Sequence, residues 1–165
     1  MIEKERPALT QPVTKEVRAE ARALLGTAGF AALSFADAQT GAPNISRVGL
    51  VVLGDGRPAF PASGLTAHFA ALSRDPRCAL LVGEPGKGDP LAHKRMSVIG
   101  RAVMLAPGSA AEDDAKARYL ASHPKAGIYL DLPDFRFFAV EIETASFNGG
   151  FGRAHRLTQA DFTAG

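Results

Sequence analysis

Segments with the two-residue period of β-strands follow one another through short turns in the first half of this chain, and this arrangement constrains the fold most strongly. FAALSFA (30–36) is followed by the turn-rich DAQTGAPN and then by the β-branched run ISRVGLVVL (45–53). Asp55-Gly56 is a hairpin signal, and RPAFPAS (57–63) supplies the return strand. Because strands joined by short turns pair antiparallel, we expect a mostly antiparallel sheet.

The rest of the chain adds three strand-like segments and three helices. The strands are CALLVG (78–83), RMSVIGRAVML (95–105) and FRFFAVEIETASF (135–147), and Gly100 inside the second one indicates a bulge or bend. Helical spacing of apolar residues predicts helices over 14–27, about 65–73 and 109–124. Thr14 is the expected N-cap of the first helix, and Ser109 with Glu112 forms a capping box for the last one.

Six strands around one core predict a mainly β fold with flanking helices (α+β), a six-stranded antiparallel barrel that is closed or split. A doubly wound sheet would need a helix after nearly every strand, and the sequence does not provide them. A length of 165 residues suits a single domain. We assign residues 1–12 to a flexible N-terminal arm, 13–154 to the barrel domain and 155–165 to a C-terminal tail.

Charge and composition exclude several classes of function. The formal net charge is only +2 and the basic residues are scattered, so we expect no nucleic-acid partner. No apolar run is long enough to span a bilayer and the polar N-terminus lacks a signal core, so we expect a cytoplasmic protein without a membrane contact. Cys78 is the single cysteine, and its place at the start of CALLV predicts a buried, inert thiol.

Metal and acyl-transfer chemistry find no support in the motifs. The four histidines, at positions 68, 93, 123 and 155, are not at metal-ligand spacing, so we expect no metal site. No GxSxG motif surrounds a serine. GEPGKGD (83–89) lacks the spacing of a phosphate-binding loop and is expected to be an exposed loop.

The stretch SGLTAHFAALSRDPR (63–77) suits the binding of an anion. Ser63 and Thr66 can cap the helix that begins there, and a helix N-terminus attracts phosphate through its unpaired N–H groups. His68 lies in the first turn, while Arg47 and Arg95 begin or border strands and could grip a phosphate with paired hydrogen bonds. Taken singly, the same residues are also explained as ordinary helix caps and surface side chains.

The order of these segments resembles the pyridoxamine 5′-phosphate oxidase-like FMN-binding split barrels. The resemblance covers about residues 13–154, and the branch it is most similar to is that of the haem-iron-utilisation (HugZ-type) proteins. The residues that carry it are SGLTAHFAAL, DPR (75–77), DPL (89–91), HPKAGIY (123–129) and NGGFGRA (148–154).

The resemblance implies a homodimer that holds FMN between two barrels, and it implies a set of cofactor-binding positions. Ser46, Arg47 and Val48 fall on the strand that approaches the flavin, and Arg95 falls where a polar side chain reaches across from the partner. The full set is Ser46, Arg47, Val48, Ser63, Thr66, His68, Arg95 and Asn148.

Three departures from the family pattern bear on function. His68 stands where the classical oxidases have a phosphate-binding lysine, so phosphate affinity is expected to depend on pH. The chain has no Trp, which argues against pyridoxamine phosphate as substrate. The sequence given ends at Gly165, whereas longer haem-utilisation proteins continue into a further domain, and we expect this to weaken the case for haem.

The leading hypothesis is therefore an FMN-dependent oxidoreductase that acts on a small redox substrate, with no residue identified as a catalytic acid or base. The alternatives are a haem-binding or haem-utilisation protein, with His155 as the candidate ligand, and a non-catalytic flavin-binding dimer. The residues do not name the electron donor or the substrate, and they leave FMN, the deazaflavin F420 and haem open as the occupant.

Overall fold

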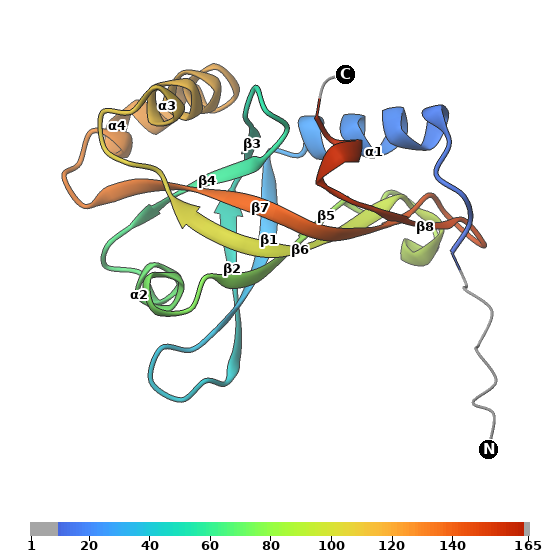
Figure 1. Cartoon of the computed structure of the whole chain (residues 1–165), viewed down its shortest axis with the longest axis horizontal. Helices are drawn as coiled ribbons and strands as arrows, with labels where there is room; N and C mark the ends of the chain where they lie inside the picture. The colour runs from blue at the N-terminus through green and yellow to red at the C-terminus, as the bar shows by residue number, and fades with distance from the viewer. Residues whose placement is uncertain (1–9, 164–165) are drawn as a thin grey trace.

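The computed structural model describes residues 10–163 and contains one strongly curved antiparallel sheet with helices along its margins (Figure 1). The strand order is β2-β1-β5-β6-β7-β4-β3, and β8 pairs with β7 outside this path. The strands are β1 (Phe30–Ala36), β2 (Pro43–Gly49), β3 (Val51–Val52), β4 (Pro58–Ser63), β5 (Arg77–Val82), β6 (Arg95–Met104), β7 (Phe135–Asn148) and β8 (Ala154–Leu157).

The predicted α+β antiparallel barrel is confirmed, with two strands more than the six expected. The run 45–53 is divided at Leu50. The backbone N–H of Leu50 donates to the carbonyl of Gly29 at 3.0 Å at the end of the β1–β2 pairing, and from Val51 on the chain pairs with β4 as β3. The eighth strand, β8, lies in the segment that was expected to be a tail. This segment has only four residues and is too polar to stand out as a strand in the sequence.

Gly100 lies at a bulge, as predicted. The register between β6 and β7 shifts between Ile99 and Gly100. A Cβ atom on Gly100 would lie 2.0 Å from the carbonyl oxygen of Glu141. Only glycine therefore allows β7 to approach this closely, and the bulge bends the sheet toward a barrel.

The helices follow the expected caps, with one difference. They are α1 (Lys15–Thr27), α2 (Ala67–Arg74), α3 (Ala110–Ser122), α4 (Gly127–Leu130), and the 3-10 turns η1 (Pro90–Ala92), η2 (Pro124–Ala126) and η3 (Gln159–Asp161). Thr14 caps α1, and Ser109 accepts a hydrogen bond from the backbone N–H of Glu112 at 3.2 Å. The Glu112 carboxylate accepts from the N–H of Gly108 rather than from that of Ser109, so the reciprocal half of the capping box is displaced by one residue.

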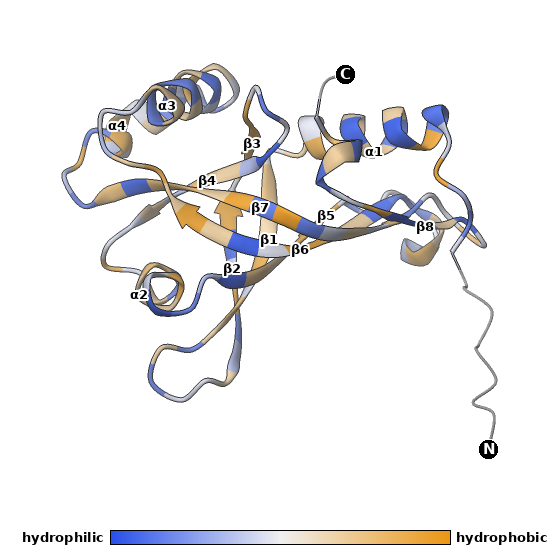
Figure 2. Cartoon of the chain, viewed as in Figure 1, coloured by the Kyte–Doolittle hydropathy of each residue, from blue (hydrophilic) through white to orange (hydrophobic). Residues whose placement is uncertain are grey.

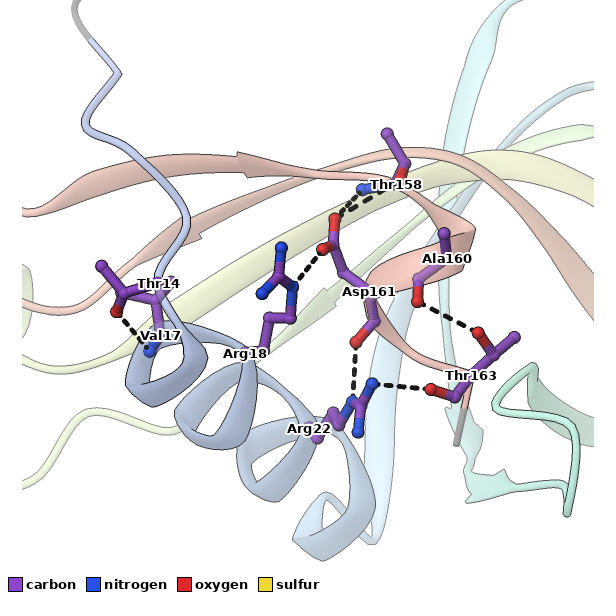
Figure 3. A network of polar contacts seen from close by, with 8 residues as sticks. All are labelled: Thr14, Val17, Arg18, Arg22, Thr158, Ala160, Asp161 and Thr163. Carbon is purple, nitrogen blue, oxygen red and sulfur yellow. Dashed lines mark hydrogen bonds and ion pairs between the residues drawn. The ribbon is translucent and has the colours of Figure 1, made fainter. Parts of the chain in front are cut away.

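The expected C-terminal tail is part of the domain over residues 155–163, which corrects the boundary at 154. Leu157 and Phe162 are buried in the core, and β8 extends the sheet beside β7. Arg18 on α1 forms an ion pair with Asp161 at 2.6 Å, and Arg22 donates to two backbone carbonyls of the same turn (Figure 3). Of the expected arm, residues 1–9 lie outside the described part of the chain, while the backbone N–H of Gln11 donates to the carbonyl of Ala154.

The core consists of two apolar clusters, one on each side of the sheet. Apolar residues, orange in Figure 2, recur along the strands and helices. The larger cluster fills the inside of the curved sheet and includes the buried side of α1. The smaller one lies between the outer side of β3, β4 and β7 and the helix α3. Between residues 10 and 163, no helix is long and apolar enough to cross a membrane.

Within residues 10–163, no helix covers the outer side of β1, β2, β5 and β6 in this way, and we call this side the open face. Along β5 buried and more exposed residues alternate, whereas β4 is buried at five consecutive positions. Alternation means that only one side of a strand is packed. The exposed large apolar residues of the open face are Phe30, Ile45, Leu81, Ile99 and Val103.

Candidate ligand-binding site

A cavity of about 720 Å³ opens at the edge of the open face, beneath the C-terminal end of α1. This volume falls in the range of small-molecule and cofactor sites. Three segments form it: the end of α1 with the start of β1, the middle of β2, and the chain that leaves β5. The lining residues are Leu24, Thr27, Ala28, Gly29, Phe30, Ala32, Ile45, Ser46, Arg47, Leu81, Val82, Gly83, Glu84 and Pro85.

Arg47 is the cationic side chain of this cavity. It is exposed on β2, opposite Ala32 of β1, and its guanidinium carbon lies 5.2 Å from the centre of the Phe30 ring. The ring and the guanidinium attract each other in this geometry, which holds the cation over the apolar surface. In the part of the chain that the structure describes, Arg47 forms no ion pair, whereas Arg57 and Arg77 each pair with a nearby aspartate. Arg47 is therefore available to an anionic ligand.

The neighbours of Arg47 on β2 point to the other side of the strand. Ser46 is half-buried, pairs with Leu33 and still lines the cavity. The side chain of Val48 is buried in the core opposite Ala31. Of this predicted trio, Ser46 and Arg47 line the cavity and Val48 does not.

Ser63 and Thr66 lie together at the start of α2, but their hydroxyl groups already have protein partners. Ser63 Oγ donates to the carboxylate of Asp134, and Thr66 Oγ1 donates to the carbonyl of Ser63 at 2.8 Å. Thr66 also accepts from the backbone N–H of Phe69, which completes the cap of α2. The Asp134 carboxylate brings negative charge to the place where phosphate was expected, so the geometry gives these residues no support as a phosphate site.

His68 points into the core rather than toward a ligand or solvent. It is 8% exposed, and its ring meets that of Phe35 edge to face with the centroids 6.0 Å apart. Burial lowers the pKa of His68 because it disfavours the charged imidazolium. The expectation of a cationic partner for phosphate at this position does not match the structure, since a neutral buried ring supplies no positive charge.

Arg95 and Asn148 face each other across β6 and β7, and neither lines the cavity. Arg95 donates to the carbonyl of Leu91 at 3.0 Å, and Asn148 accepts from the backbone N–H of Gly150. Gly83, which lines the cavity, packs so closely on this strand that a Cβ atom would lie 2.8 Å from the Cα of Arg95. The backbone of Arg95 thus packs against a residue of the cavity wall, while the polar groups of Arg95 and Asn148 bind neighbouring loops.

His155 was expected to lie free in a C-terminal tail. In the structure it is a buried residue of β8. It is 5% exposed, its ring stacks on Phe147, and its Nδ1 lies 3.0 Å from the carbonyl oxygen of Pro12. Among residues 10–163 no group of three or more metal-ligating side chains occurs. Cys78 is buried, and burial raises the pKa of its thiol to about 12, which confirms the inert cysteine.

The sequence did not reveal most of the cavity wall. Residues 27–29 and 81–85 are small, apolar or turn-forming, and none carries a chemical signature. The one available signal was the pair Gly26 and Gly29, which marked the end of a helix. The wall exists because α1 ends over the sheet edge, and that is a property of packing rather than of a motif.

Comparison with known proteins identifies the family of the chain. Residues 17–149 match the family described as pyridoxamine 5′-phosphate oxidase. The chain therefore belongs to this split-barrel family, as the resemblance had implied.

Two of three similar proteins carry names connected with haem. The chain is 32% identical over 124 residues to the chloroplast heme oxygenase HOZ of Arabidopsis thaliana, and this covers 73% of the chain and 36% of that protein. It also resembles the crystal structure of the protein Atu2129 of Agrobacterium tumefaciens, with a TM-score of 0.81, 33% identity, and 97% and 66% of the two chains covered. A heme binding protein from Mycobacterium smegmatis gives a TM-score of 0.80 and 27% identity, with 92% and 61% covered. The chain thus spans about a third of the plant protein and less than two thirds of each of these two solved chains.

Proposed function

We propose that this protein binds haem in the cavity at the edge of the open face and takes part in haem utilisation. The observation that carries the proposal is Arg47, which has no ion pair among residues 10–163 and lies beside an apolar surface in a cavity of cofactor size. The names of the Arabidopsis and Mycobacterium relatives support haem over the FMN oxidoreductase that we expected from the sequence.

The residues present fit the organic part of haem. The porphyrin is a flat apolar ring with two carboxylates on one edge, so it needs an apolar surface next to a cation. Phe30, Ile45 and Leu81 provide the surface, and Ile45 is 69% exposed. Arg47 can hold a carboxylate with two parallel hydrogen bonds.

The cavity lining contains no His, Cys, Met or Tyr, which are the usual axial ligands of haem iron. On this proposal the described chain therefore holds haem through the ring and its acid groups. Any chemistry at the iron would need an axial ligand that this lining does not supply. His155 is not that ligand in the structure, because its ring is packed against Phe147.

We also propose that two copies of the chain associate through the open face. Five exposed large apolar side chains lie on neighbouring strands there, and contiguous apolar surface of this kind marks an interaction site. A second barrel placed on this face would cover the cavity edge and bury the ring of the ligand. The site would then lie between the subunits, as the family resemblance implies.

FMN is the competing occupant of this cavity, and the deazaflavin F420 is an alternative to FMN on the same grounds. The family match favours a flavin, and Arg47 could bind a phosphate as well as a carboxylate. Against it, the predicted phosphate site at the start of α2 holds the carboxylate of Asp134. An oxidoreductase activity with a small redox substrate belongs to this alternative, as does a flavin-binding protein without turnover.

Titration of the purified protein with haemin, and separately with FMN, tests the proposal. We expect haemin to give a saturable Soret band and FMN to give no saturable change. Arg47→Ala should weaken haemin binding about tenfold, since a charge-assisted hydrogen bond contributes about 1.5–3 kcal/mol and solvent screens part of it.

Arg77→Ala is the matched control for this titration. Arg77 is an exposed arginine on β5, but it is paired with Asp75 and does not line the cavity. We expect the Arg77→Ala variant to bind haemin with the same affinity as the wild type. Saturable FMN binding without haemin binding would overturn the haem proposal in favour of the flavin.

A further inference from the structure

A second cavity, of about 500 Å³, lies on the other side of residues 27–29 from the first. Thr27, Ala28 and Gly29 line both cavities, so this short connection between α1 and β1 is a wall with open space on two sides. A segment with few packing partners is held mainly by its hydrogen bonds. The position of this wall therefore depends on what tethers it.

Within residues 10–163, the two hydrogen bonds that join this wall to other elements both end on the carbonyl oxygen of Gly29. One comes from the backbone N–H of Leu50 at 3.0 Å. The other comes from the side chain of His123, whose Nε2 lies 2.7 Å from that oxygen. Because a carbonyl oxygen only accepts, Nε2 of His123 carries the hydrogen in this contact.

His123 is itself fixed by α3. Its ring stacks on Tyr119 with the centroids 4.1 Å apart and the planes 10° apart, and Ser122 Oγ lies 2.9 Å from Nδ1. Tyr119 in turn covers Gly49, where a Cβ atom would lie 1.9 Å from the tyrosine hydroxyl oxygen. Gly49 pairs with Phe30, the aromatic residue under Arg47.

From these contacts we infer that His123 is a positioning residue for the ligand cavity. It connects α3, which does not line the first cavity, to the wall beside Phe30 and Arg47. This inference rests on the proposed function, because it assigns the wall a role in holding the ligand of that site. It makes His123 part of the binding machinery through Gly29 and not through contact with the ligand.

The test compares His123→Ala with His123→Gln and with Tyr129→Phe in the full chain. Gln can place a donor close to the position of Nε2, whereas Ala cannot. Tyr129→Phe removes the hydroxyl contact with Tyr119, at 3.2 Å, and leaves the bond to Gly29 in place. Tyr129→Phe therefore controls for a general loosening of the contacts around Tyr119 and His123.

Two readouts separate a positioning role from a purely structural one. Hydrogen exchange of the Leu50 amide in the ligand-free protein reports on the wall directly, because this N–H is the second tether of Gly29. Haemin titration reports on the cavity. We expect His123→Ala to speed Leu50 exchange and to weaken haemin binding about five- to tenfold, as for the loss of one hydrogen bond. His123→Gln should restore most of both, and Tyr129→Phe should change neither.

Unchanged Leu50 exchange in His123→Ala would overturn the inference. So would unchanged haemin affinity despite faster exchange, or an equal loss in Tyr129→Phe. If the wild type binds no haemin, the proposed function fails first. FMN then serves as the probe in the same four proteins, and an absence of binding by both ligands would overturn the positioning role as well.

Discussion

The outer side of the sheet is divided into a covered half and an open half that differ in what their exposed positions can do. In the covered half, over β3, β4 and β7, Phe137 and Ala139 pack beneath α3 together with Tyr119. In the open half, over β1, β2, β5 and β6, side chains of similar apolar character such as Leu81 and Ile99 face solvent. One sheet thus carries a second small core at one end and an uncovered apolar surface at the other.

The comparison indicates that stability and ligand binding depend on different halves of the sheet. The covered half gains burial on both sides of its strands, and this contributes to the free energy of unfolding. The open half forgoes that contribution and keeps an apolar surface next to Arg47 and the cavity. We conclude that changes in the two halves should affect different measurements.

The largest effect is expected from Phe137→Ala in the covered half. Phe137 is buried and meets the ring of Tyr119 edge to face at 5.8 Å, so its loss leaves a cavity under α3. The free energy of unfolding should fall by about 3–5 kcal/mol. Urea unfolding of the ligand-free protein measures it. A loss below about 1 kcal/mol would show that α3 does not form a core with the sheet.

A smaller effect on folding, but a clear effect on assembly, is expected from Ile99→Asp in the open half. Because Ile99 is exposed on a single subunit, its replacement should change the free energy of unfolding of one barrel by about 0.5 kcal/mol or less. Sedimentation should show a dimer for the wild type and a monomer for the variant, since a charge would be buried in the contact.

Leu65→Asp is the control for that experiment. Leu65 is an exposed apolar residue in the turn before α2, outside the open face. Its replacement should leave the dimer intact. If both variants sediment like the wild type, the open face is not the contact between subunits.

The smallest expected effect is on the stability at low pH, to which the buried His68 contributes. It tests whether the α2 region, unlike the cavity, is a packed part of the core. Burial holds the pKa of His68 below its ordinary value of 6.5, so the unfolded chain binds more protons than the folded one below that pH. Stability should therefore be complete above the ordinary pKa and should be lost as the pH falls through the folded pKa.

Urea unfolding at a series of pH values measures this loss, with His68→Gln as the comparison. The variant should lack the part of the pH dependence that His68 contributes. An identical dependence in the two proteins would mean that the pKa of His68 is the same in the folded and the unfolded chain, which would contradict its place as a buried neutral ring.

Much of the fold could be predicted from the sequence because its signals are local. The segment 30–36 is a strand with the predicted bounds, Thr14 and Ser109 cap the expected helices, and Gly100 marks the bulge. β8 could not be predicted, because four residues with one strongly apolar side chain carry no periodic pattern. Its partner, β7, is supplied by a tertiary contact.

The site was predicted less completely, and the reason is physical. Arg47 was singled out as an arginine that could grip a phosphate, the resemblance added Ser46, and both residues line the cavity. Ser63 was placed at an anion site because hydroxyl groups near a helix start suit one, but its partner Asp134 is 71 residues away in the chain. Likewise Phe35, which faces His68, belongs to a different element, so no local pattern could indicate burial of that histidine.

The most direct test of the account is to locate bound haemin by hydrogen exchange, comparing the protein with and without the ligand. We predict slower exchange in the segments that line the cavity, at residues 29–34, 45–48 and 81–84, and no change at residues 63–69 at the start of α2. Protection confined to residues 63–69, or no protection in any of the cavity segments when haemin is bound, would contradict the assignment of the ligand to the open half of the sheet.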